Sequence, residues 1–183
     1  DRAFFMTRLR ACLKSFGGSL LCWCLMDNHF HLLVKMENGH LSDFMHHLLN
    51  GYAGYFNRLH GRSGPLFEGR FKSEPVDADS YFLDVVRYIH WNPVKAGISR
   101  GLSYPWSSYD VLAASDAAWR DGSFVVDIFG GVEQFKQFHL AENEATRVMD
   151  AFQRVRRLVS DREALSVARS ALGGADPGLL NGC

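Results

Sequence analysis

The chain has no excess of charge of either sign. Its 183 residues contain 20 Lys and Arg and 20 Asp and Glu, so the formal net charge is zero when histidine is neutral. This balance excludes a protein that holds nucleic acid through overall positive charge, but it is compatible with a local basic groove. Histidine is unevenly spread, because seven of the eight lie between His29 and His90.

Long apolar runs and paired cysteines are also missing. No apolar run approaches the ~20 residues that a membrane-spanning helix needs, and no signal-peptide pattern is present. We therefore expect a cytoplasmic protein with no membrane partner. The four cysteines form no Cys-x-x-Cys pair, and Cys22 and Cys24 lie in an apolar segment. This pattern indicates reduced core cysteines, without a disulfide framework or a zinc site.

The spacing of apolar residues predicts both helices and strands in the first half of the chain. Helical periodicity is found over residues 1–16, 42–58 and 79–92, and two apolar runs over 20–26 and 29–36 are typical of buried strands. Ser42 and Asp79 are expected N-caps. Pro93 should end the third helix close to Asn92, because the residue before proline disfavours helical geometry.

The tail carries no catalytic motif. We expect helices over residues 142–159 and 162–172, followed by a Gly- and Pro-containing end. Three arginines, Arg154, Arg156 and Arg157, could touch a DNA backbone, although such a cluster is more often a solvated helix face.

Two histidines stand at the head of the second strand. Side chains two apart on a strand point to the same face, so His29 and His31 should project together. Two converging imidazoles are half of a metal site. The alternative is that they are simply polar residues at the rim of the strand.

A tyrosine and a carboxamide share one stripe of the third helix. Asp84, Tyr88 and Asn92 are four residues apart and therefore lie on one face. Beside the histidine pair, Tyr88 would be a nucleophile and Asn92 a third ligand, whereas alone the stripe would be an ordinary helix surface. Asp84 is an outside candidate for tuning the tyrosine, and His90 points elsewhere.

Cations and aromatic residues alternate in residues 60–72. Such a mixture suits single-stranded nucleic acid, because cations follow phosphates and aromatic faces stack on bases. The alternative is a surface hairpin whose aromatic residues pack inward. The residues concerned are Arg62, Phe67, Arg70, Phe71 and Lys72.

An ordered set of short motifs resembles one known family. The set consists of Met26-Asp27-Asn28-His29-Phe30-His31-Leu32-Leu33-Val34, Gly61-Arg62-Ser63-Gly64-Pro65-Leu66-Phe67, Gly69-Arg70-Phe71-Lys72, Arg87-Tyr88-Ile89-His90-Trp91-Asn92-Pro93-Val94-Lys95-Ala96-Gly97 and Tyr104-Pro105-Trp106-Ser107-Ser108-Tyr109. Together these motifs resemble the REP-associated tyrosine transposases, which are single-tyrosine HUH endonucleases within the IS200-like transposase family.

The resemblance implies an α+β, ferredoxin-like HUH domain with a central antiparallel sheet and packed helices. We expect this domain over residues 1–112 and a helical C-terminal extension over 113–183. Members of the family normally begin with a central strand that precedes the first helix, and we find no such strand in the sequence. If that strand is absent, the sheet has an unfilled position.

The resemblance also implies a reaction. Tyr88 matches the nucleophile, and His29, His31 and Asn92 match a shell for Mg²⁺ or Mn²⁺. The implied enzyme is a transposase and nicking endonuclease that cleaves and rejoins single-stranded, hairpin-containing DNA through a 5′-phosphotyrosine. Its expected DNA contacts are Arg62, Phe67, Arg70, Phe71, Lys72 and Lys95.

Other functions and the assembly stay open at this point. One alternative is a catalytically silent hairpin-DNA binder, and a nucleotide hydrolase of the histidine-triad type would need a histidine in place of Leu33. The resemblance also implies a bacterial, nucleoid-associated protein. Relatives include monomers and dimers, so a homodimer is open.

Overall fold

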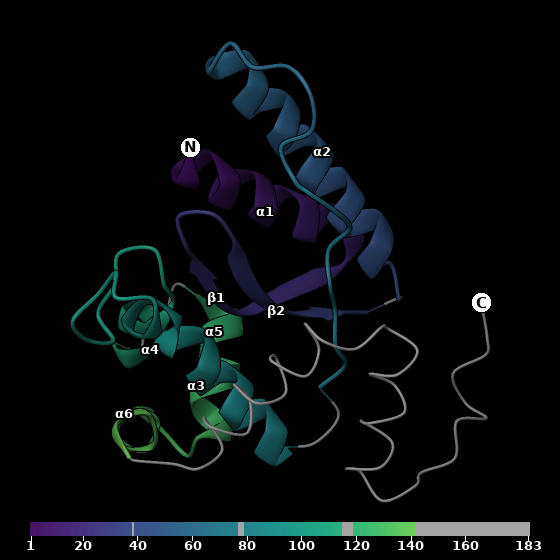
Figure 1. Cartoon of the computed structure of the whole chain (residues 1–183). Coiled ribbons are helices and arrows are strands. Elements are labelled where there is room, and N and C mark those ends of the chain that lie inside the picture. Colours follow the sequence, from purple (N-terminus) through teal and green to yellow (C-terminus); the bar gives the residue numbers. More distant parts are fainter. Residues whose placement is uncertain (38, 77–78, 115–118, 142–183) are drawn as a thin grey trace, which may run out of the picture. The chain divides into compact units, whose positions relative to one another are not determined.

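The computed structural model describes residues 1–37, 39–76, 79–114 and 119–141, which belong to one structural unit, Asp1–Ala141. The predicted tail helices and the cluster of Arg154, Arg156 and Arg157 lie outside the described residues. The elements in chain order are α1 (Arg2–Phe16), β1 (Gly18–Leu25), β2 (Phe30–Met36), α2 (Leu41–Leu59), α3 (Asp79–Lys95), α4 (Tyr109–Ala113), α5 (Arg120–Ile128) and α6 (Val132–Leu140) (Figure 1).

Strands β1 and β2 form an antiparallel hairpin, as the two apolar runs predict. The turn falls at Asp27 and Asn28, and the Met26 N–H donates to the His29 carbonyl across it at 2.9 Å. Gly17 lies between α1 and β1 with a φ of 65°, a left-handed conformation that glycine adopts without strain. A short turn at each end therefore fixes the strands in place.

The hairpin register decides which side chains face which helices. Leu20 pairs with Val34 and Cys22 pairs with Leu33, so Leu21 is an extra residue that forms a bulge. Because paired residues share a face, Cys22, Cys24, His31 and Leu33 lie on one face. The opposite face presents Leu20, Trp23, Leu25, Phe30 and Leu32.

Helices α1 and α2 cover that second, apolar face. Phe5, Leu9 and Leu13 of α1 pack in one buried cluster with Phe44 and Leu48 of α2 and the apolar strand residues. This cluster is the main core of the unit.

A close approach at Gly51 joins α1 to α2. The Arg8 guanidinium donates to the carbonyls of Leu48 and His47 at 3.2 and 2.7 Å. The guanidinium occupies the space that a Cβ on Gly51 would need, so any other residue at this position would clash with Arg8. Glycine within this helix is therefore explained by packing rather than by a break.

Two helix boundaries differ from the sequence prediction. Helix α2 begins at Leu41, because the Phe44 N–H already donates to the His40 carbonyl at 3.0 Å, so the prediction of Ser42 as the N-cap is wrong. Helix α3 continues to Lys95 with Pro93 inside it. Proline removes only its own N–H here, and the Ala96 N–H still donates to Asn92 at 3.0 Å, so the helix ends one turn later than predicted.

The outer edge of β1 is covered by later parts of the chain. The Leu20 N–H donates to the Asp121 carboxylate at 3.1 Å, the Trp23 N–H donates to Ser108 Oγ at 3.0 Å, and the Leu25 N–H donates to the Trp106 carbonyl at 2.8 Å. Helix α5 packs against β1, and α6 packs against α4 and α5. These contacts close one side of the sheet to further pairing.

The described part of the chain is thus α+β, with a two-stranded antiparallel sheet and several helices. Cys12, Cys22 and Cys24 are buried free thiols. No helix among the described residues is long and apolar enough to cross a membrane.

Candidate metal and nucleophile site

The hairpin brings the two predicted histidine ligands together. His29 follows the turn and His31 is the second residue of β2, and their ring centroids are 5.0 Å apart with the rings nearly perpendicular. His29 is exposed, and its Nδ1 lies 2.7 Å from Asn28 Oδ1. A carboxamide oxygen only accepts, so Nδ1 carries the proton and Nε2 carries the lone pair. The turn therefore fixes the orientation of this imidazole.

His31 is held neutral with an unsatisfied nitrogen. Burial and, to a smaller extent, the adjacent His29 lower the pKa of its imidazole to about 4, and the Asn92 side chain partly opposes both effects. At neutral pH the ring is therefore uncharged. Its buried Nε2 has no hydrogen-bond partner among the described residues. A buried polar atom without a partner costs free energy unless something else binds it.

Helix α3 places Tyr88 and Asn92 against this histidine. The Tyr88 and His31 ring centroids are 5.6 Å apart in an edge-to-face arrangement. Asn92 Nδ2 donates to the Tyr88 carbonyl at 2.8 Å, which leaves its side-chain oxygen as the acceptor. Tyr88 is only 7% exposed. The predicted stripe is therefore a helix face turned toward the histidine pair.

Lys95 adds positive charge at the same place. Its ammonium nitrogen lies 4.9 Å from the Tyr88 ring centroid, which is a cation–π distance. The sequence suggested Lys95 as a DNA contact but gave no reason to expect it beside the phenol. Asp84 lies one turn before Tyr88, and burial raises the pKa of its carboxyl while Arg87 opposes the shift.

The donor atoms of these residues are chemically compatible with a divalent ion. No group of three or more His, Cys, Asp or Glu side chains among the described residues could hold a metal. His29, His31 and the Asn92 oxygen instead offer a mixed set of nitrogen and oxygen donors. A metal would bind the His31 Nε2, which has no hydrogen-bond partner among the described residues. Two imidazoles and one carboxamide are the donor types of an open site that water or phosphate would complete.

A second histidine pair lies on another side of α3 and is fully buried. His90 Nδ1 lies 2.8 Å from His139 Nε2, and His90 Nε2 lies 2.8 Å from Ser108 Oγ. His139 Nδ1 lies 2.8 Å from the Phe135 carbonyl. Both histidines have no exposed surface. This network ties α3 to β1 and α6, and sequence reasoning missed His139, although Phe135 one turn earlier marks an inward face.

The predicted DNA-binding segment, residues 60–72, has no regular secondary structure over most of its length, and its aromatic side chains pack against the rest of the unit. Phe67 contacts Phe30 and Tyr52, each with centroids 6.4 Å apart, and Phe71 packs against the core. This arrangement favours the interpretation in which the aromatic residues face inward.

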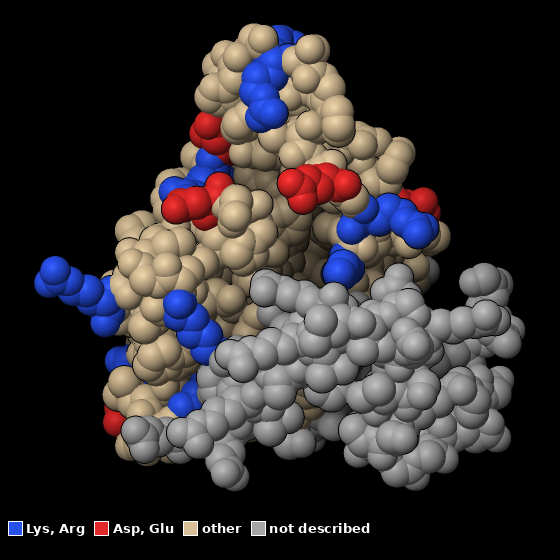
Figure 2. Space-filling model, in the orientation of Figure 1, with Lys and Arg blue, Asp and Glu red and all other residues tan. Residues whose placement is uncertain are grey.

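The cations of the same segment are exposed. They are Arg62, Arg70 and Lys72. On the face shown in Figure 2, Lys and Arg side chains are spread over several parts of the surface rather than gathered in one patch.

Comparison with known proteins assigns a family to the region that holds these residues. A family model described as "Transposase IS200 like" matches residues 2–92, which include the hairpin, α1, α2 and α3 through Asn92. No curated protein and no solved structure matches the chain. Residues 2–92 of this chain are therefore similar to the IS200-like transposases.

Proposed function

We propose that the protein is a metal-dependent endonuclease and strand transferase that acts on single-stranded DNA containing hairpins. In this proposal the unit is a ferredoxin-like HUH domain of the REP-associated type, and it works at a bacterial nucleoid. The observation that carries the proposal is the meeting of His31, Tyr88 and Asn92, because it unites an unsatisfied ligand nitrogen with a phenol and a carboxamide.

Each residue has a defined part in the proposed reaction. His29, His31 and the Asn92 oxygen would hold Mg²⁺ or Mn²⁺, which when bound would polarise the scissile phosphate and stabilise its negative charge. Lys95 is placed to draw the phosphate toward the phenol. A tyrosine with an ordinary pKa near ~10 is a weak nucleophile, so such help is needed at neutral pH.

The bond changes balance without any external energy source. The Tyr88 oxygen forms a bond to phosphorus, the phenol proton is lost, and the bond between phosphorus and the 3′ oxygen breaks. The 3′ oxygen takes up a proton and leaves as a hydroxyl. Attack by the 3′-hydroxyl of a second strand reverses these changes and rejoins the DNA, so one site performs both cleavage and transfer.

The burial of Tyr88 adds a requirement. Only 7% of the Tyr88 surface is exposed, so in this proposal its side chain becomes more accessible before the attack. We infer that DNA binding rearranges the surroundings of α3. The exposed cations Arg62, Arg70 and Lys72 are the proposed backbone contacts, and Phe67 and Phe71 would stack on bases only after leaving their inward positions.

A covalent adduct tests the proposal directly. The protein is incubated with hairpin-bearing single-stranded DNA and Mn²⁺, which imidazole suits better than Mg²⁺, and then denatured. We expect a protein–DNA adduct from the natural chain and none from Tyr88→Phe, which should still bind DNA. Tyr81→Phe is the matched control, because Tyr81 lies on the same helix with its hydroxyl bonded to Glu74.

The alternative is a silent hairpin-DNA binder derived from a transposase. It predicts equal binding by the natural chain and Tyr88→Phe, with no adduct from either at any metal concentration. An adduct that persists in Tyr88→Phe would instead place the nucleophile elsewhere.

A further inference from the structure

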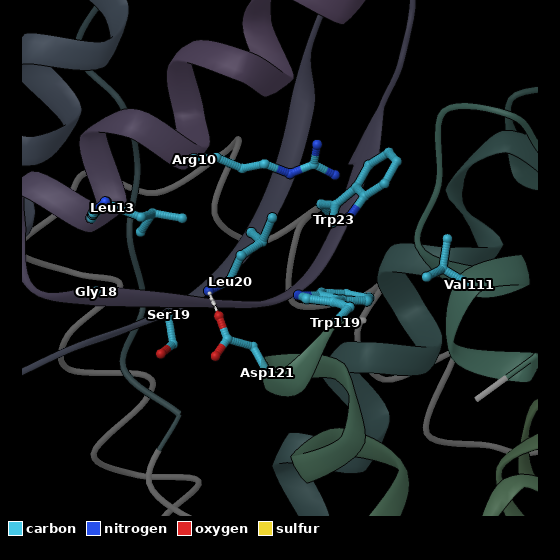
Figure 3. A pocket seen from close by; sticks show the side chains of 10 residues that line it. Arg10, Leu13, Gly18, Ser19, Leu20, Trp23, Val111, Trp119 and Asp121 are labelled. Atoms are coloured by element: carbon cyan, nitrogen blue, oxygen red, sulfur yellow. Dashed lines mark hydrogen bonds between the residues drawn. The ribbon is translucent and has the colours of Figure 1, made fainter. Parts of the chain in front are cut away.

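A cavity on the other side of the molecule has the composition of a nucleotide site. It has a volume of about 640 Å³ and lies between α1, the outer edge of β1 and the segment leading into α5 (Figure 3). Trp23 lines it from the sheet face that carries the apolar core, whereas His31 and Tyr88 lie on the opposite face. The cavity is therefore separate from the proposed cleavage site.

Its aromatic walls are held in place by packing. Trp119 lies across the first turn of α5, and a Cβ on Gly122 would come within 2.6 Å of its indole ring and 3.0 Å of Leu112. Any other residue at 122 would push the indole away, so the glycine keeps Trp119 seated. Figure 3 shows the indole of Trp23 bordering the same space, but Trp23 is buried in the core, so the half-buried Trp119 is the stacking surface. Rigid indoles are surfaces on which nucleobases stack.

Charges of opposite sign lie at different parts of the cavity. Arg10 and Lys14 are exposed and stand one turn apart on α1, so both cationic groups can face one phosphate. The Asp121 carboxylate lies beside Ser19, and one of its oxygens accepts the Leu20 N–H at 3.1 Å. Its second oxygen is suited to the N–H donors on the edge of a base. The carboxylate would repel phosphate, which favours a single orientation of the ligand.

We propose that this cavity binds a nucleotide, with its base against Trp119 and its phosphate at Arg10 and Lys14. The same chemistry is offered by a free nucleotide and by an unstacked nucleotide of a DNA strand. The strand is the ligand that follows from the proposed function, on which this part of the inference rests. A second contact on the far face would anchor DNA while α3 acts on another part of it.

The test measures binding without catalysis. Fluorescein-labelled (dT)₁₅, which contains no hairpin, is titrated with the full chain in EDTA and followed by anisotropy. We expect Trp119→Ala to weaken binding about five- to a hundredfold, the range for removal of one stacked base, and Trp119→Phe to retain most of the affinity. The double variant Arg10→Ala, Lys14→Ala should weaken binding and reduce the slope of log affinity against log salt by about 0.7 for each phosphate that is no longer neutralised.

Matched controls separate this inference from the proposed reaction. Arg100→Ala removes an exposed cation outside the cavity and should bind (dT)₁₅ as the natural chain does. Thermal unfolding verifies that each variant is folded, and the exposed pair Arg10 and Lys14 keeps the test decisive if Trp119→Ala does not fold. The adduct assay on the same proteins reports the cleavage reaction independently.

The binding results distinguish the nucleotide site from the proposed cleavage reaction. Unchanged (dT)₁₅ binding by the folded Trp119→Ala protein and by the double variant would overturn the inference, even if adducts form normally. Weakened binding supports it, even if no adduct forms with any DNA. Competition by dTMP at the natural chain but not at Trp119→Ala would identify a free nucleotide as a ligand, and its absence would assign the cavity to a DNA strand.

Discussion

The histidine pair His90 and His139 differs from the pair His29 and His31 in how many ring nitrogens have hydrogen-bond partners. His90 and His139 are fully buried, and their ring nitrogens bond to each other, to Ser108 and to the Phe135 carbonyl. His31, beside Tyr88, is mostly buried with an Nε2 that has no partner among the described residues. A completed network stabilises the fold, whereas an unsatisfied nitrogen is available to a ligand. Burial alone does not tell the two roles apart, but hydrogen-bond satisfaction does.

Removing one histidine of each pair should produce the largest difference in stability between them. His90→Ala leaves His139 Nε2 without its partner and opens a cavity beside Phe135, so we expect the free energy of unfolding to fall by about 3–5 kcal/mol. His31→Ala removes a nitrogen that has no partner among the described residues and should cost no more than about 1 kcal/mol while abolishing adduct formation. Urea denaturation of both variants measures the difference, and equal decreases would contradict it.

Metal should stabilise one pair and leave the other unaffected. A ligand that binds only the folded state adds about 2.7 kcal/mol when its concentration is about 100 times Kd. We expect Mn²⁺ to raise the Tm of the natural chain and of His139→Gln, and to have no effect on His31→Ala. A Tm increase that survives in His31→Ala would show that the ion binds elsewhere.

Lowering the pH should destabilise the folded protein through His139. Burial lowers the pKa of its imidazole to about 4, with Arg87 acting in the same direction and the bond to the Phe135 carbonyl opposing both. Between about pH 6.5 and 4 the unfolded state binds a proton here that the folded state does not, so stability falls as the pH falls. His139 should contribute a slope of up to about 1.4 kcal/mol per pH unit over this window.

The measurement is the free energy of unfolding at a series of pH values, without added metal. His139→Gln should show a shallower dependence than the natural chain between about pH 6.5 and 4, with parallel curves above about pH 7. Identical slopes in the two proteins would mean that His139 gains its proton in the folded state as readily as in the unfolded state.

Local patterns predicted the parts of the fold that local physics determines. Helix α1, the hairpin with its turn at Asp27 and Asn28, α2 and α3 follow from periodicity and turn residues, and the boundaries at Ser42 and Pro93 were wrong by about one turn or less. Within residues 109–141 the sequence predicted no individual helix, only a helical extension over 113–183, because α4, α5 and α6 are short helices stabilised by tertiary contacts. The domain boundary at residue 112 stays a prediction.

The site shows the same division. His29 with His31 and Tyr88 with Asn92 were each recognisable by spacing, and the resemblance to a known family joined the two groups. The approach of Lys95 to the phenol, the His90–His139 network and the Trp119 cavity depend on packing between segments that are far apart in the sequence. No pattern within one segment carries that information.

The bulge at Leu21 determines which face of the hairpin each strand residue occupies. Because of that one extra residue, Leu20 and Cys22 face opposite sides of the sheet although they are two positions apart. The face that carries the main core and the face turned toward α3 are thus kept distinct by a single unpaired position. Changes in strand length by an even number of residues would leave both imidazoles where they are, while an odd change would turn His31 into the core. We therefore expect this hairpin to tolerate only insertions and deletions of an even number of residues.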